Sequence, residues 1–192
     1  MEIKQSTRET ILSIALDLFS LRGYESVGIQ EIVDKSGITK PTLYHHFGSK
    51  RGLLDAIIAD QGGKMHGIVE RGAAYNHDLV MNLTLLTREL INFALTNQSF
   101  YRLHLALMSS APETETYHAY LPLRTGINAL LETMFIEASK DHGNMKGREK
   151  AYSETFQGMV RTWSTLIVNK ELELTDDLLY KAVHQFMHGI FS

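Results

Sequence analysis

The 192-residue sequence contains no cysteine, only three prolines, and no apolar run near the roughly 18 residues that span a bilayer. The absence of cysteine excludes disulfide bonds, thiolate metal sites and cysteine-based catalysis. The N-terminus, Met-Glu-Ile-Lys-Gln-Ser, contains no apolar core of a signal peptide, so we expect a cytoplasmic protein. Gly-x-Ser-x-Gly, His-Glu-x-x-His and phosphate-binding glycine loops are also missing. An enzyme is therefore the less favoured hypothesis, and we predict no cofactor.

The positive charge of the chain is local. The net charge is −3, yet residues 1–52 contain seven Lys and Arg against six Asp and Glu, and the remainder contains twelve against sixteen. Residues 35–51 contain four basic side chains, two histidines and no acidic one. A basic patch of this kind matters more for contact with phosphate than the overall charge does.

Helical periodicity and capping residues predict an all-α chain of about nine helices. Ser6 with Glu9 forms a capping box before the first helix, and Gly23 ends that helix. No convincing alternation of period two indicates a strand. The expected helices cover about 7–22, 29–36, 39–46, 49–72, 78–96, 97–109, 112–140, 147–169 and 175–191.

Two of these expected helices contain residues that weaken or interrupt helical structure. Gly62, Gly63 and Gly67 lie in the second half of the fourth helix, where each glycine costs about 1 kcal/mol relative to alanine. This predicts either a break near Gly62 or a compliant link to the rest of the chain, and the sequence does not decide between them. Pro122 is expected to kink the long helix after Pro112 or to start its main part.

Residues 28–50 read as two short helices joined by a tight turn. Gly37 suits the turn because glycine enters left-handed backbone space without steric cost. Thr39 is a natural N-cap, and Pro41 falls in the first turn, where a missing N–H costs nothing. Leu43 and Phe47, four residues apart, form the inward face. A helix, a glycine turn and a helix with a basic and aromatic outer face are the pattern of a helix-turn-helix DNA-binding motif.

This segment resembles the TetR/AcrR family of bacterial transcriptional regulators. The resemblance covers about residues 7–55 and rests on Ile11-Leu-x-x-Ala-Leu-x-Leu-Phe, Gly23-Tyr24 and Gly37-Ile-Thr-Lys-Pro-Thr-Leu-Tyr-His-His-Phe-Gly-Ser-Lys50. The sequence departs from the family at Val27-Gly28, where two Ser or Thr residues are usual, which removes a hydroxyl able to cap the second helix. The resemblance implies a helix-turn-helix DNA-binding domain at residues 1–50. It also implies a helical effector-binding and dimerisation domain at residues 51–192.

The resemblance assigns the DNA contacts to the second helix of the motif and its flanks, with Gln30 at the start of the first helix of the motif. Lys40 suits direct readout, because lysine can donate to guanine O6 and N7 in the major groove. Tyr44 lies four residues further on, with a phenol suited to a phosphate oxygen. The predicted DNA-binding residues are Gln30, Thr39, Lys40, Pro41, Thr42, Tyr44, His45 and Lys50.

Aromatic and sulfur-containing side chains recur at helical spacing in the second domain. Such residues belong to the core more often than to a pocket, but the resemblance and the polar tips of several of them favour a cavity for an apolar or aromatic effector. The candidate pocket residues are Phe93, Tyr101, His104, Met108, Tyr120, Met134, Phe156, Met159 and Trp163.

The last two helices are expected to form a homodimer interface, since the resemblance implies that they pair with those of a second copy. Their apolar faces could instead close the core of one protomer. The candidate interface residues are Leu166, Ile167, Leu179, Val183, Phe186, Met187 and Ile190. His184 and His188 are spaced to reach one metal ion, but no carboxylate is evidently placed to complete a site, so we predict none.

The sequence therefore predicts a ligand-responsive transcriptional regulator. The favoured form is a homodimeric repressor released from a near-palindromic DNA operator by a small molecule. The alternative is a DNA-binding protein of the same fold with an activating or non-transcriptional role.

Overall fold

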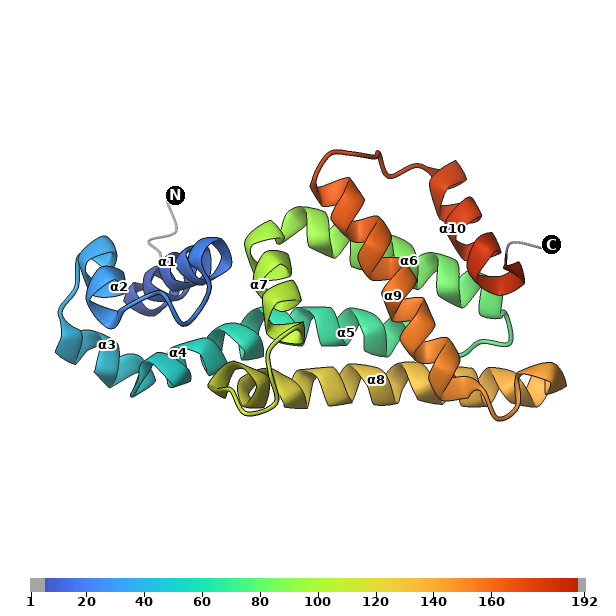
Figure 1. Cartoon of the computed structure of the whole chain (residues 1–192), viewed down its shortest axis with the longest axis horizontal. Coiled ribbons are helices and arrows are strands. Elements are labelled where there is room, and N and C mark those ends of the chain that lie inside the picture. Colours follow the sequence, from blue (N-terminus) through green and yellow to red (C-terminus); the bar gives the residue numbers. More distant parts are fainter. Residues whose placement is uncertain (1–5, 190–192) are drawn as a thin grey trace. The chain divides into compact units, whose positions relative to one another are not determined.

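The computed structural model describes residues 6–189, and all regular elements in this part of the chain are helical (Figure 1). Helices α4, η1 and α5 follow one another without a loop and form one continuous helix. Counted in this way, the described residues contain nine helices, as predicted. A short 3₁₀ turn, η2, separates α8 from α9. The elements are α1 (Thr7–Arg22), α2 (Ile29–Ser36), α3 (Lys40–Phe47), α4 (Lys50–Ile57), η1 (Ile58–Gly62), α5 (Gly63–Gly72), α6 (Leu79–Thr96), α7 (Gln98–Met108), α8 (Glu115–Asp141), η2 (Gly143–Met145), α9 (Glu149–Val168) and α10 (Asp176–His188).

The chain forms two compact units, each built from two segments. The first unit comprises Met1–Gly63 and Gln98–Arg124, and the second comprises Lys64–Asn97 and Thr125–Ser192. The division expected after residue 50 stays a prediction.

Helix α1 is central to the first unit, where it packs against α2, α4 and α7. Its inward stripe of Ile11, Ala15, Leu18 and Phe19 is buried, as the periodicity predicted. The capping box is present as well, because the Ser6 amide donates to Glu9 Oε2 at 2.8 Å and the Glu9 amide donates to Ser6 Oγ at 3.2 Å.

The glycine-rich part of the fourth helix continues without a break. Between Ile58 and Gly62 the chain forms a π-helical turn, which takes up one extra residue without ending the helix. A Cβ atom on Gly62 would lie 2.5 Å from Leu123 Cδ2. Glycine at this position therefore permits a close approach of the Leu123 side chain, and the expected break near Gly62 is wrong.

In the second unit α6 packs against α9 and α10. The rings of Phe135, Phe156 and Phe186 form a cluster with centroids 5.6–6.3 Å apart. The buried Asn82 amide donates to the carbonyl oxygens of Gly72 at 2.9 Å and Ala74 at 3.0 Å, which satisfies backbone groups at the end of α5.

Helix α8 differs from its predicted form at its start. It begins at Glu115 rather than near Pro112, because Thr114 Oγ1 accepts from the Tyr117 amide at 3.2 Å and caps the helix there. Pro122 lies inside the helix, so the prediction that it starts the main part is wrong. Helix α10 ends at His188, since Gly189 has a φ of +74°. None of the helices in residues 6–189 combines the length and apolar character that a membrane crossing requires.

Candidate DNA-binding surface and effector region

The turn between α2 and α3 has the geometry that its residues favour. Gly37 adopts the left-handed conformation, with φ +62° and ψ +32°, and ends α2. Thr39 is the N-cap of α3, where its Oγ1 accepts from the Thr42 amide at 3.4 Å and lies 2.9 Å from Thr42 Oγ1. Pro41 occupies the first turn of α3. Helix α3 is therefore started and oriented by local contacts.

One face of α3 is buried and the opposite face is open. Leu43 is fully buried and Phe47 is half-buried. The exposed side chains include Lys40 and Tyr44, and Tyr44 is 45% exposed. Lys40 has no ion-pair partner among residues 6–189, so its ammonium group is available to an anion. The exposed or half-exposed predicted DNA contacts on this helix and its cap are Thr39, Lys40, Pro41, Thr42, Tyr44 and His45.

Lys50 and Gln30, two further predicted DNA contacts, also have partners within the protein. Lys50 Nζ lies 4.1 Å from the centroid of the Tyr24 ring and donates to the Glu25 carbonyl oxygen at 3.5 Å. The exposed Gln30 side chain donates from Nε2 to Asp34 Oδ1 at 2.7 Å. Gly28, at the N-cap of α2, provides no side-chain hydrogen bond, as expected from the departure at Val27-Gly28.

Two exposed groups that are not among the predicted DNA contacts lie on or beside this surface. The Arg8 guanidinium lies 5.5 Å from the centroid of Phe47, which places a cation of α1 next to the end of α3. His46 is exposed, and its ring lies 5.5 Å from that of His45. Periodicity within α3 could have indicated His46, whereas the placement of Arg8 depends on how α1 packs.

In the first unit three of the predicted pocket residues lie together. Tyr120 and His104 are joined by a hydrogen bond of 2.5 Å between the phenol oxygen and Nδ1, and the Tyr101 ring lies 5.8 Å from that of His104. Burial raises the pKa of Tyr120, so its hydroxyl remains protonated at neutral pH. Met108, at the end of α7, is half-buried.

The other predicted pocket residues lie in the second unit. Met134 and Phe156 are fully buried, Phe93 is buried, and Met159 is half-buried. Trp163 packs against a cluster formed by Ile91, Ile167 and Leu179.

Two buried hydroxyl groups of this unit were not predicted from the sequence. Thr87 Oγ1 in α6 and Ser153 Oγ in α9 have no hydrogen-bond partner among the described residues. A buried polar group without a partner costs about 1–3 kcal/mol, so a bound molecule or water at either position would be stabilising. Sequence gave no signal for them, because serine and threonine occur on inward and outward helix faces alike.

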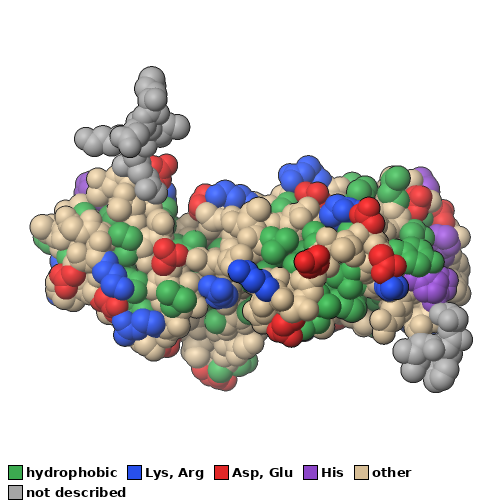
Figure 2. All heavy atoms as spheres, turned by 90° about the horizontal axis from the view of Figure 1, so that it is seen from above, with side chains coloured by type: hydrophobic (Ala, Val, Ile, Leu, Met, Phe, Trp, Pro, Cys, Tyr) green, Lys and Arg blue, Asp and Glu red, His purple; other side chains and the backbone are tan. Residues whose placement is uncertain are grey.

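The candidate interface residues divide between buried and exposed positions. Ile167, Leu179 and Val183 are buried within the protomer, and Phe186 contacts the phenylalanine cluster. Leu166 is half-buried and Met187 is exposed. Figure 2 shows hydrophobic side chains on the outer face of the C-terminal helices, with histidines beside them. Ile190 lies outside the described residues.

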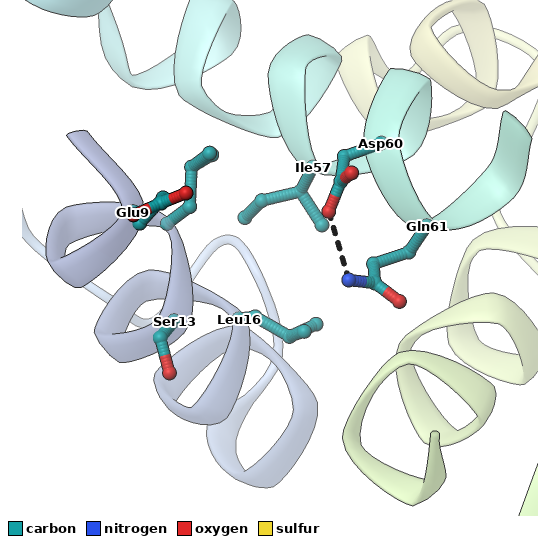
Figure 3. A pocket seen from close by; sticks show the side chains of 7 residues that line it. Glu9, Ser13, Leu16, Ile57, Asp60 and Gln61 are labelled. Atoms are coloured by element: carbon teal, nitrogen blue, oxygen red, sulfur yellow. Dashed lines mark hydrogen bonds between the residues drawn. The ribbon is translucent and has the colours of Figure 1, made fainter. Parts of the chain in front are cut away.

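An open pocket of about 310 Å³ lies against α1 and η1 in the first unit (Figure 3). Its lining combines apolar side chains such as Leu16 and Ile57 with the polar side chains of Glu9 and Asp60. None of the predicted effector-binding residues contributes to it. The lining residues are Glu9, Leu12, Ser13, Leu16, Ile57, Asp60 and Gln61.

Within residues 6–189, no group of three or more His, Cys, Asp or Glu side chains is placed to bind a metal ion. The rings of His184 and His188 lie 4.5 Å apart on the exposed side of α10, and the tilted Tyr180 ring lies 5.4 Å from that of His184.

Comparison with known proteins places the helix-turn-helix region in an established group. Residues 11–57 match the sequence model of bacterial regulatory proteins of the tetR family. The transcriptional repressor KstR2 of Rhodococcus jostii is 38% identical over 73 residues, which cover 36% of this chain and 36% of KstR2. The transcriptional activator FasR of Mycolicibacterium smegmatis is 40% identical over 55 residues, which cover 29% of this chain and 25% of FasR. These matches thus span about a quarter to a third of the relatives' length.

Solved structures resemble the whole chain at low sequence identity. The TetR-family regulator PfmR of Thermus thermophilus has a TM-score of 0.75 and 20% identity, over 98% of this chain and 99% of its own. FadR of Bacillus subtilis, solved in complex with stearoyl-CoA, has a TM-score of 0.76 and 16% identity, over 94% of this chain and 98% of its own. At this identity the likeness establishes the fold alone.

Proposed function

Because the chain belongs to the TetR family of transcriptional regulators, we propose that it is a homodimer that binds a near-palindromic DNA operator and releases it when a small molecule binds. This family is not enzymatic, in agreement with the absence of catalytic patterns in the sequence. Such a regulator acts on the chromosome and hence in the cytoplasm. The domain organisation that accompanies this function is DNA binding by residues 1–50 and effector binding and dimerisation by residues 51–192.

The open face of α3 is the observation that supports DNA binding most directly. Lys40 and Tyr44 lie exposed on a short helix whose other side is anchored by Leu43. A helix of this kind enters the major groove, where its first turn contacts base edges. One α3 helix reads too few bases for useful specificity, so two copies would bind half-sites about 34–36 Å apart or a multiple of that distance.

The dimer would use the faces of α9 and α10 that remain open in one protomer. Met187 and Tyr180 are the exposed apolar side chains of α10, at 37% and 66%. Tyr180 lies four residues before His184, and Met187 directly precedes His188. Buried candidates such as Leu179 would then support this surface from beneath.

The effector is proposed to be an apolar or aromatic small molecule. The hydrogen-bonded pair of His104 and Tyr120 supplies a polar anchor among aromatic rings. Long-chain acyl-CoA is the first class to test, because the structurally similar FadR was solved with stearoyl-CoA.

Repression is the favoured sign of regulation, as stated from the sequence. The similar relatives include a repressor and an activator, and their likeness is confined to the DNA-binding region. Transcription in vitro from a promoter that contains the selected operator distinguishes the two signs.

The test begins with purified protein and a pool of random duplexes, from which a bound sequence is selected. Lys40→Ala is expected to weaken binding to this duplex by about 1–3 kcal/mol, or roughly 5- to 150-fold, and to relax preference at one base pair of each half-site. Lys140→Ala is the matched control, because Lys140 is an exposed lysine of α8 in the second unit that pairs with Glu137 at 2.5 Å. Equal losses in the two variants, on selected and random DNA alike, would contradict the role of Lys40.

A further inference from the structure

Glu115, the first residue of α8, contacts two separate parts of the helix-turn-helix region. The Tyr24 hydroxyl donates to Glu115 Oε2 at 2.5 Å. Arg51 Nη1 donates to the Glu115 backbone oxygen at 3.1 Å, while Arg51 Nε donates to Asp55 Oδ1 at 2.8 Å. Tyr24 follows α1 and Arg51 belongs to α4, so one residue of α8 holds both ends of the segment that contains α2 and α3.

The Tyr24 ring in turn holds Lys50. Tyr24 is 5% exposed, and its ring packs edge-on against Phe19 with the centroids 5.1 Å apart. The Lys50 ammonium group lies 4.1 Å from the centroid of the Tyr24 ring. Lys50 is the first residue of α4 and follows the end of α3 at Phe47 by three positions. A shift of Tyr24 would therefore move a predicted phosphate contact and the start of α4 together.

The same part of α8 also reaches the candidate effector region. Tyr120 lies five residues after Glu115 on this helix, and its buried hydroxyl is bonded to His104 of α7. A ligand that competes for this hydrogen bond would therefore act on the second turn of α8. Glu115 is the first residue of α8, and it contacts Tyr24 and Arg51 of the DNA-binding region.

We propose that the hydrogen bond between Tyr24 and Glu115 sets the affinity of α3 for DNA. Glu115 acts as a positioning residue, since its effect passes through Tyr24 and Lys50. The intact bond favours the arrangement that binds the operator, and displacement of the α8 N-terminus at the His104–Tyr120 pair opens it. This inference rests on the proposed function as a DNA-binding regulator.

The test measures the affinity of full-length variants for the duplex selected by the unmodified protein. Tyr24→Phe removes only the hydroxyl, and Glu115→Ala removes only the carboxylate while the backbone contact to Arg51 remains possible. Each is expected to weaken binding at least about fivefold, the lower end of typical coupling between sites. The double variant should bind as each single variant does, because both changes remove the same bond. Glu115→Gln keeps an acceptor for the Tyr24 hydroxyl, so its affinity for the duplex should stay within about twofold of that of the unmodified protein. A change of this size is smaller than the contribution of one neutral hydrogen bond.

A matched pair of variants controls for the loss of a tyrosine–carboxylate bond as such. The Tyr75 hydroxyl donates to Asp141 Oδ2 at 3.0 Å in the second unit. Tyr75→Phe and Asp141→Ala are expected to leave the DNA affinity unchanged. Urea unfolding of every variant separates lost stability from lost affinity of the folded protein.

Two results would overturn this inference while leaving the proposed function intact. The first is unchanged DNA affinity in folded Tyr24→Phe and Glu115→Ala, and the second is a double variant whose loss equals the sum of the two single losses in free energy. If the unmodified protein enriches no duplex from the random pool, the proposed function fails and this inference fails with it.

Discussion

Replacement of Gly52 by alanine is expected to destabilise the protein at the junction of α3 and α4. Gly52 is the third residue of α4, and its amide donates to the capping Ser49 Oγ at 2.9 Å. A Cβ atom on Gly52 would lie 2.0 Å from the Phe47 carbonyl oxygen and 3.2 Å from the Phe47 carbonyl carbon. Phe47 is the last residue of α3, so the added methyl group meets backbone that no side-chain rotation can move away.

The size of the effect follows from two opposing contributions. Carbon–oxygen contacts are normally about 3.3 Å or longer, so the backbone must move by more than about 1 Å. Overpacking of this kind costs about 1–3 kcal/mol, and the upper end applies to a rigid backbone atom. Alanine gains about 1 kcal/mol over glycine in a helix. We therefore expect a net loss of about 2 kcal/mol in the free energy of unfolding, which lowers Tm by roughly 4–8 °C in a chain of this size.

Gly63→Ala is the matched control for Gly52→Ala. Gly63 lies in the same continuous helical rod with φ −60°, and a Cβ atom there has no neighbour within 4 Å. Both changes remove the same freedom from the unfolded chain, so the difference between them isolates the contact with Phe47. Gly63→Ala should raise the free energy of unfolding by up to about 1 kcal/mol.

Urea unfolding followed by circular dichroism measures both variants. The affinity of Gly52→Ala for the selected duplex should fall as well, since the turn that positions α3 must move. The reasoning is refuted if Gly52→Ala unfolds at the same urea concentration as Gly63→Ala or at a higher one.

Two further predictions concern the second unit. Phe156 is fully buried against Phe135 and Phe186, so Phe156→Ala should cost about 3–5 kcal/mol in urea unfolding, and a loss below about 1 kcal/mol would contradict its role in the core. Hydrogen bonds from His77 and Tyr75 lower the pKa of Asp141 below its ordinary value of 3.8. The ionised Asp141 carboxylate therefore stabilises the folded state above the ordinary pKa of 3.8, and this stabilisation is lost as the pH falls through the lower pKa of the folded state. The free energy of unfolding of Asp141→Asn should consequently depend less steeply on pH below about pH 4. Superimposable acid profiles of the two proteins would count against this assignment.

The helix-turn-helix region was predictable because local rules determine its form. Gly37 ends α2 in the left-handed conformation, Thr39 caps α3, and Leu43 is the buried anchor. Each of these features depends on residues within a few positions of one another, which a single sequence displays. The capping box at Ser6 and the buried stripe of α1 were predictable for the same reason.

The partners of inward-facing residues were not predictable from spacing. Periodicity placed Trp163 and Leu179 on apolar faces, and the family resemblance suggested a pocket for one and an interface for the other. In the structure Trp163 packs against a cluster that Leu179 forms with Ile91 and Ile167, a contact that spacing does not reveal. The contact between Tyr24 and Glu115 joins residues 91 positions apart. Such pairs depend on how helices pack, and a single sequence does not indicate which helix faces are in contact.

The position of Lys50 shows how the local and long-range parts of the structure combine. The family resemblance implies that Lys50 contacts a phosphate, and in the structure its ammonium group lies over the Tyr24 ring and donates to the Glu25 carbonyl oxygen. An ammonium group has three donors, so these two interactions leave one for a phosphate oxygen, and Lys50 is only half-buried. Because burial and the bond to Glu115 raise the pKa of Tyr24, its ring stays uncharged at neutral pH and holds Lys50 through its face. The Lys50 side chain is thereby oriented in the absence of DNA, so the proposed phosphate contact would lose less side-chain entropy on binding.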